Sequence, residues 1–348
     1  MKTLKLNFKS LYDLHKAFPT EKSCIRYLEH KLWPKGVVSP YDPTSKVYKR
    51  GDGLYRCKNT GKNFNVLIGT FMEGTKLPLR KWFQAIYQIT NNKKGNSATQ
   101  LAKDIHVTLK TAWFLNHRIR TAYQLDVQDK LTGEVELDET FVGGKNKNRH
   151  RNKKVKHSQG RSFKDKVPVM GMLERGGRVV CKVVKDTSYK SLTAPILRIV
   201  DRSTTLYMDE WIGYKTVQRV YKHGVVDHGH GIYVDGGTYT NTIESFWSNY
   251  CKRAITGTYN HLSRKHMQRY FDEFAFCYNT RNVKEVERWD SVFDNCHHRL
   301  TYNQLTHNKK NKTSKVYDFV KHKTQTIWQE VKKVQVSITN CFHRFGRN

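Results

Sequence analysis

Three acidic residues far apart in the chain have the types and positions to serve one chemical purpose: Asp138, Asp209 and Glu244. Carboxylates supply the hard oxygen ligands that Mg²⁺ and Mn²⁺ prefer, and a trio can hold two such ions roughly 4 Å apart. Two ions at that spacing favour in-line displacement at a phosphodiester, because one activates the attacking oxygen and the other stabilises the leaving oxygen. These residues are therefore candidate catalytic and metal-binding residues.

Each acid taken alone also has an ordinary explanation. Asp138 and Asp209 fit strand ends or caps, and Asn241 with Glu244 fits a capping box at the start of a helix. Only the ordered set, on suitable elements and inside a very basic chain, favours catalysis.

The residues around Asp138 alternate with a period of two from Gly133 onward, which predicts a strand. One face holds Val135, Leu137, Glu139 and Phe141, and the other holds Glu136, Asp138 and Thr140. Asp138 and Glu139 therefore point apart, and Asp138, on the more polar face, is the one assigned to the metal site.

The elements that follow have the order expected of an RNase H-like domain. Strands are predicted at 167–173 and 178–184, joined by a turn at 174–177, and then come a helix at 192–200, a strand at 204–209 and a helix at 242–253. Asp209 ends a strand and Glu244 begins a helix. We expect an α/β fold, a mixed sheet flanked by helices.

The chain is strongly basic. It has 63 Lys and Arg against 30 Asp and Glu, a formal net charge of +33, which indicates a polyanionic partner. Residues 145–166 hold ten Lys or Arg, among them Lys145, Lys147, Arg149 and Arg151. This segment fits either a solvated loop or a loop that contacts phosphates.

Two short helices precede the predicted strand at Asp138. Ser97 can cap the first, and the second has an apolar stripe from Ala112 to Ala122. Four candidate DNA-binding side chains are predicted elsewhere on the second helix's surface: Lys110, His117, Arg118 and Arg120. The pair fits a helix-turn-helix that enters a major groove, or an ordinary helical hairpin within a core.

Seven cysteines are spread singly, without a C-x-x-C pair, so neither a disulfide framework nor a zinc site is expected. No apolar run of about 18 residues and no signal-peptide core is present. We therefore expect no membrane partner and an intracellular protein, in the cytoplasm or nucleoid of a bacterium or in the nucleus of a eukaryote.

The residues themselves resemble the ISXO-like insertion-sequence DDE transposases and their eukaryotic Merlin relatives over about residues 31–282. The resemblance rests on motifs in matching order: 135–145, 167–173, 207–210, 241–247, Lys252 with Arg253, 257–259, 269–274 and 278–281. Upstream, 111–114 and 117–120 are similar to the end of the family's helix-turn-helix. The resemblance implies metal-binding roles for Asp138, Asp209 and Glu244, and DNA contact by Lys252.

The chain departs from the family in two places. Family members often carry a zinc ribbon, but Ser39-Pro40-Tyr41-Asp42 stands where one cysteine pair belongs and only Cys57 remains of the other. We predict a ribbon-shaped remnant that binds no zinc. Tyr239 replaces a His often seen before Asn241, and catalysis is not expected to depend on it.

The predicted organisation has four parts. These are an N-terminal region with a degenerate zinc ribbon (1–90), a helix-turn-helix (91–128), an RNase H-like DDE catalytic domain (129–282) and a basic helical tail (283–348). The tail has Ile327, Val331, Val334 and Ile338 at helical spacing. Packing on its own domain, pairing with a second subunit and lying along DNA are all open for it.

The predicted function is DNA transposition. The chain would bind terminal inverted repeats, cleave by two-metal-ion hydrolysis and join the 3′-hydroxyl to target DNA, with at least a homodimer bringing two ends together. Two alternatives remain: a DNA-binding protein without catalysis, either a domesticated transposase or a repressor, and an RNase H-fold nuclease that cuts branched DNA.

Overall fold

The computed structural model describes residues 6–124, 130–144, 146, 149–156, 165–209, 212–226 and 239–307. The chain divides into two compact units, each built from separated stretches of sequence. The first comprises Met1–Ala85, Phe114–Ala122 and Asp290–Asn348, and the second Ile86–Trp113 and Tyr123–Trp289. The domain boundaries at residues 90, 128 and 282 remain predictions.

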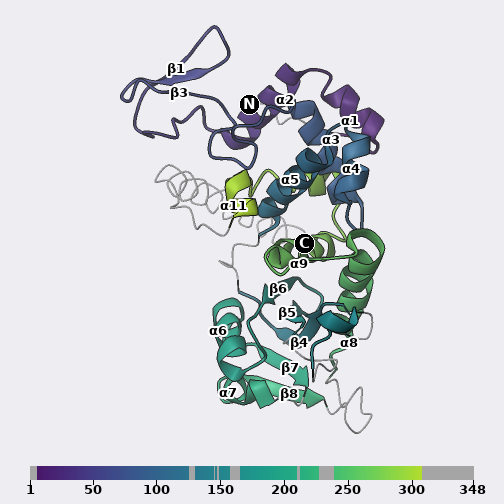
Figure 1. Cartoon of the computed structure of the whole chain (residues 1–348). Coiled ribbons are helices and arrows are strands. Elements are labelled where there is room, and N and C mark those ends of the chain that lie inside the picture. The colour runs from purple at the N-terminus through teal and green to yellow at the C-terminus, as the bar shows by residue number, and fades with distance from the viewer. Residues whose placement is uncertain are drawn as a thin grey trace, which may run out of the picture. The chain divides into compact units, whose positions relative to one another are not determined.

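The first unit contains helices that the sequence analysis did not predict. They are α1 (Leu11–Ala17), α2 (Glu21–Leu32) and the first part of α3 (Leu79–Asn91) (Figure 1). The side chain of Ser10 caps α1, and Thr20 and Ser23 form a capping box on α2. These hydroxyls satisfy N–H groups that a helix start leaves without partners, a signal the sequence interpretation missed.

A small antiparallel sheet in the first unit has the order β1 (Val47–Lys49), β2 (Tyr55–Cys57) and β3 (Asn63–Phe64). Its inner face packs Tyr55, Cys57 and Phe64 into an apolar cluster with Trp33. Cys57 is buried, and Ser39 and Thr60 hydroxyls hydrogen-bond to it, lowering the pKa of its thiol to about 6 although burial opposes this.

The outer face of the same sheet points to solvent. Tyr48 pairs with Arg56, which pairs with Asn63, and all three are exposed. Lys46 and Lys58 extend this row, where the Lys58 N–H donates to the Lys46 carbonyl oxygen at 3.0 Å. We call these five residues the basic sheet face.

The second unit is built on a five-stranded mixed sheet with the order β6-β5-β4-β7-β8. Its strands are β4 (Glu134–Val142), β5 (Val167–Glu174), β6 (Val179–Val183), β7 (Thr205–Asp209) and β8 (Lys222–Val226). The first three pair antiparallel, and β7 pairs parallel with both β4 and β8. The four predicted strands are confirmed. β8 was not predicted, because Lys222 and His223 interrupt its apolar pattern.

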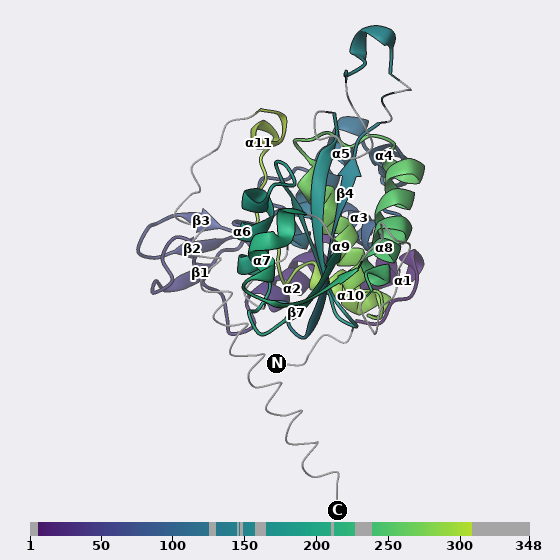
Figure 2. The same ribbon diagram turned by 90° about the horizontal axis from the view of Figure 1, so that it is seen from below.

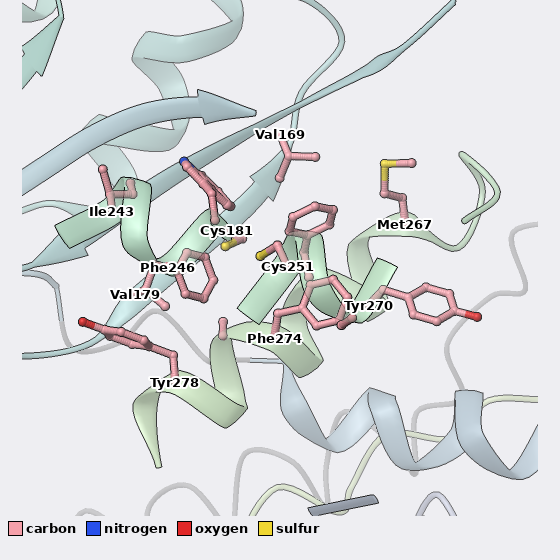
Figure 3. Close-up of a cluster of buried hydrophobic side chains, with 14 of the residues drawn as sticks. Val169, Val179, Cys181, Ile243, Phe246, Cys251, Met267, Tyr270, Phe274 and Tyr278 are labelled. Atoms are coloured by element: carbon pink, nitrogen blue, oxygen red, sulfur yellow. The ribbon is translucent and has the colours of Figure 1, made fainter. Parts of the chain in front are cut away.

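Helices cover both faces of this sheet (Figure 2). On one face, α6 (Tyr189–Ile199) and α7 (Lys215–Gln218) bury an apolar cluster that includes Val135, Leu137 and Met208. On the other, α8 (Asn241–Phe246) and α9 (Met267–Asn279) bury Ile243, Phe246 and Phe274 against β5 and β6 (Figure 3).

The helix predicted at 242–253 is α-helical only at its start. After α8 the chain continues as π-helical turns at Trp247–Lys252 and Ile255–Tyr259. The N-cap is Thr240, and its side chain makes no capping hydrogen bond. The capping box proposed for Asn241 and Glu244 is therefore wrong, because Asn241 already lies inside the helix.

The two helices predicted before β4 are present as α4 (Ala98–Asp104) and α5 (Leu109–Arg120). The Ser97 side chain accepts from Gln100 N–H, as expected of a cap, and His106 between the helices has φ +50. The helix-turn-helix assignment stays a prediction.

The remaining described helices are α10 (Glu285–Ser291) and α11 (Tyr302–Thr306). The predicted tail helix with Ile327 and Val331 lies outside the described residues. Among the described helices, none is both long and apolar enough to cross a bilayer.

Candidate active site

Asp138 and Asp209 lie level with each other on neighbouring parallel strands. The pairing of β4 with β7 ends at Glu136 and Tyr207, and Asp138 and Asp209 each lie two residues beyond that pair. The charge of Asp209 acts on the Asp138 carboxyl, so the two acids lie near each other. Side chains two residues apart share a face, and neighbouring strands are about 4.8 Å apart. The two carboxylates therefore project from the same face of the sheet, the one covered by α8.

Asp138 and Glu139 point to opposite faces, as predicted. The hydroxyl of Tyr214, which belongs to the cluster under α6 and α7, donates to Glu139 Oε1. Asp138 instead accepts from Trp247 Nε1 at 2.9 Å through Oδ2, and from the Glu139 N–H at 2.8 Å through Oδ1. Asp138 thus belongs to the α8 side of the sheet.

Gly171 makes room for the Trp247 contact. It lies opposite Asp138 on β5, in a strand that is otherwise buried and apolar. A Cβ at position 171 would lie 2.4 Å from Trp247 Cζ2, which is far inside van der Waals contact. The absent side chain lets the indole lie across β5 and reach Asp138.

Glu244 comes from the first turn of α8 and is exposed. The preceding residue, Ile243, donates its N–H to Glu136 Oε2 at 2.9 Å. Glu136 is fully buried and lies two residues before Asp138 on the same face of β4. The start of α8 is therefore attached to the strand that carries Asp138.

The electrostatics of Asp138 reflect the other two acids. Burial raises the pKa of its carboxyl to about 7, and the charges of Asp209 and Glu244 contribute to the rise. The hydrogen bonds from Glu139 N–H and Trp247 oppose it, since they stabilise the ionised form. Asp138 is thus close enough to Asp209 and Glu244 to be repelled by both.

No group of three or more His, Cys, Asp or Glu side chains stands ready to hold a metal ion among the described residues. The donor chemistry of the trio nevertheless fits hard divalent cations, because all three are carboxylates and two come from adjacent strands. A cation between them would offset the repulsion that raises the pKa of Asp138.

Arg175, in the turn between β5 and β6, organises the other end of this acidic face. Its Nε donates to Glu136 Oε1 at 3.0 Å, and its terminal nitrogens donate to Glu134 Oε2 at 3.0 Å and to the Tyr239 carbonyl oxygen at 2.7 Å. The guanidinium carbon lies 3.8 Å from the ring centroid of Tyr207 and 3.7 Å from that of Tyr239.

Three of the candidate DNA-binding residues on α5 are buried rather than on the helix surface. His117 is 0%, Arg118 5% and Arg120 2% exposed, so their predicted surface placement is wrong. Arg118 Nε donates to the Phe71 carbonyl oxygen and its Nη2 to the Glu73 carbonyl oxygen at 2.6 Å. The Arg118 guanidinium therefore binds backbone carbonyl oxygens of its own unit, and its burial keeps it from contacting a phosphate.

The other candidate DNA-binding residues have varied surroundings. Lys110, Arg151, Lys252 and Arg253 are exposed. Arg149 lies 3.6 Å from Asp165 Oδ2 and donates to the Asp165 carbonyl oxygen at 3.2 Å. Lys145 and Lys147 lie outside the described residues.

Sequence reasoning did not identify Glu136, Gly171, Arg175 or Trp247 as part of this site. The sequence held a signal for two of these residues. Glu136 is an acid on the predicted face of Asp138, and Gly171 interrupts an apolar strand that favours larger side chains. The partners of Arg175 and Trp247 are too distant in sequence to be inferred from local patterns.

Comparison with known proteins agrees with this architecture. Residues 130–279 match the family model described as the ISXO2-like transposase domain. This part of the chain is similar to ISXO2-like transposase domains. The matched range contains all three candidate acids and the five-stranded sheet, and the resemblance stated from the sequence motifs is confirmed.

One curated relative supports the same assignment over a longer range. It is an uncharacterized protein in transposable element ISH50 of Halobacterium salinarum, 29% identical over 246 residues. The match covers 66% of this chain and 82% of the relative. The similarity of residues 130–279 to the ISXO2-like transposase domain suggests a transposase function, which implies DNA as a partner.

Proposed function

We propose that the chain is a DDE transposase that cuts DNA at the terminal inverted repeats of its own element and joins the 3′ ends to target DNA. The observation that carries this proposal is the register of β4 and β7, which sets Asp138 beside Asp209 under the helix that bears Glu244. The family match of residues 130–279 supports it.

Asp138, Asp209 and Glu244 would hold two Mg²⁺ or Mn²⁺ ions, which supply activation of the attacking oxygen and stabilisation of the leaving oxygen. In the first step, the oxygen of water bonds to phosphorus and the bond to the 3′ oxygen breaks, which leaves a 3′-hydroxyl and a 5′-phosphate. In the second, that 3′-hydroxyl attacks a target phosphodiester, and the target's own 3′ oxygen leaves. The backbone N–H of Glu139 and the Trp247 indole hold Asp138 in place for both steps.

DNA would be held by cations that are exposed. These are Lys110, Arg151, Lys252 and Arg253. Arg149, which is partly buried, and Lys145 and Lys147, which lie outside the described residues, are proposed as further DNA contacts. The basic sheet face adds a second surface in the first unit. Among the described residues Arg56 and Lys58 have no acidic partner, so both are available to phosphates. Since two ends must be joined, we propose a homodimer or larger homo-oligomer.

The test is substitution of Asp138→Asn with cleavage, joining and binding measured separately on duplexes from the flanks of the gene. We expect cleavage and joining to fall below detection while binding without divalent metal stays within about twofold. Asp186→Asn is the matched control, because Asp186 is a partly exposed acid in the same unit, hydrogen-bonded to Ser188.

The joining assay also separates the two alternatives. A nuclease for branched DNA would cleave without forming joined products, and a DNA-binding protein without catalysis would do neither. Retained cleavage in the Asp138→Asn variant would refute the proposed mechanism.

A further inference from the structure

The first turn of α8 depends on a carboxylate from another element. A helix start has N–H groups without acceptors inside the helix, and these are usually served by the side chain of the N-cap residue. Thr240 occupies that position without making such a bond. Glu136 on β4 takes its place, accepting from the Ile243 N–H at 2.9 Å with Oε2.

A second hydrogen bond joins the same two elements one helical turn later, between Trp247 Nε1 and Asp138 Oδ2. Two residues of a strand span roughly 6.6 Å, and four residues of an α-helix rise roughly 6 Å. The spacing of Glu136 and Asp138 along β4 therefore matches the spacing of their partners Ile243 and Trp247 along the helix. Glu244 lies between the two attachment points.

Arg175 fixes the orientation of the Glu136 carboxylate. It binds Oε1 and leaves Oε2 for Ile243, so both oxygens of this fully buried group are used. The rings of Tyr207 and Tyr239 both contact its guanidinium. Arg175 also donates to the Tyr239 carbonyl oxygen, in the segment that leads into α8.

We propose that Glu136 and Arg175 are positioning residues, which hold the first turn of α8 on β4 and so present Glu244 to the metal ions shared with Asp138 and Asp209. This inference rests on the proposed function of the three acids. It goes further by assigning the geometry of the trio to an ion pair, Glu136 with Arg175, that lies outside the trio. Loss of such an outer partner commonly weakens metal binding by about 10- to 100-fold.

The experiment is a Mn²⁺ titration of the full chain bound to a DNA duplex, with free Mn²⁺ measured by electron paramagnetic resonance. Glu136→Gln keeps an oxygen for Ile243 but loses the charge, and Arg175→Lys keeps the charge but loses the planar fork. We expect either variant to bind Mn²⁺ about tenfold more weakly. Glu134→Gln is the matched control, because Glu134 also contacts Arg175 but is half exposed and does not touch α8, and its affinity should not change.

A double-mutant cycle separates positioning from general destabilisation. In a Glu244→Gln background, Arg175→Lys should weaken Mn²⁺ binding no further, because its effect is exerted through Glu244. An equal loss in both backgrounds would overturn the proposal, as would wild-type affinity in both single variants. If Glu136→Gln fails to fold, Arg175→Lys alone decides the outcome.

The proposed function fails in a different way. It is refuted if Glu244→Gln itself binds Mn²⁺ and cleaves DNA like the unmodified chain. If Glu244→Gln loses both properties while Arg175→Lys retains both, the catalytic assignment stands and the positioning role is refuted.

Discussion

The two sheets of this protein treat their polar side chains in opposite ways. In the three-stranded sheet, Tyr48 and Arg56 occupy a face open to water, and the apolar residues pack on the other. In the five-stranded sheet, both faces are covered by helices, so the acids of β4 require partners. Glu136 obtains them from Arg175 and Ile243, and Asp138 from Trp247.

The difference shows what charged side chains on a strand face indicate, depending on whether the face is open to water or covered by helices. On an open face, side-chain charge is hydrated and a change costs little stability, so its composition reports on external partners. On a covered face, each charge needs hydrogen bonds, since an unpaired buried charge is costly. The carboxylates of β4 are therefore held in fixed positions, whereas the basic sheet face is free to adapt to a ligand.

The largest loss of stability is expected from a buried cation that the sequence suggested was exposed. Arg118→Ala would leave the Phe71 and Glu73 carbonyl oxygens without their donor and remove the guanidinium from beside the Trp82 ring. We expect unfolding to become easier by about 3 kcal/mol. Chemical denaturation measures this, and a change below about 0.5 kcal/mol would show that Arg118 behaves like a surface residue.

The helix-covered face of the five-stranded sheet should also be destabilised by a larger side chain. Gly171→Ala would force the Trp247 indole away from Asp138, at a cost of about 2 kcal/mol in overpacking. Gly257→Ala is the matched control, since its Cβ would meet nothing within 4 Å. Denaturant midpoints and the tryptophan fluorescence spectrum report the two effects, and equal stability of both variants would contradict the account.

A buried acid on α9 gives a pH-dependent test of the same rule. Burial raises the pKa of Asp272 to about 6, so its contribution to stability is present near pH 4 and is lost as the pH rises through about 6. Asp272→Asn should keep the hydrogen bond from Gln268 and avoid the buried charge. We expect it to stabilise the chain by about 2 kcal/mol at pH 8 and hardly at all at pH 4. A gain that is the same at both pH values would contradict this.

The open face should show the smallest change in stability and a clear change in binding. Replacing both Arg56 and Lys58 by Ala should alter the free energy of unfolding by less than about 0.5 kcal/mol. If each contacts one phosphate, the dependence of log affinity on log salt should flatten by about 1.8. Lys22→Ala, at an exposed position on α2, serves as the control. An unchanged salt dependence would remove the basic sheet face from the DNA-binding surface.

Much of the catalytic sheet could be predicted from local patterns. Alternation located β4 and β7, and it separated Asp138 from Glu139 correctly. β5 and β6 were predicted as the two strands that flank a hairpin turn at 174–177. Alternation works because successive side chains of a strand point to opposite faces, and in β7 the two faces differ in burial. β8 was not predicted, because it is an edge strand whose first residues are polar.

Other features depend on contacts between distant residues. The burial of Arg118 follows from carbonyl oxygens 45 and 47 positions away, which no helical pattern encodes. The link from Glu136 to Ile243 spans 107 positions. Helices α1 and α2 were missed for a different reason, because their capping hydroxyls are a local signal that was not used.

The π-helical turns after α8 carry a consequence for changes in chain length. In a π-turn the amide bonds to a carbonyl five residues back, so each such turn holds one residue more than the α-helix around it. Spacing rules for α-helices therefore do not relate Glu244 to Lys252 and Arg253. Because the π-turn holds one extra residue, deletion of a single residue between Trp247 and Lys252 should be absorbed locally as the turn rewinds to an α-helix, and Lys252 and Arg253 should keep their side of the helix.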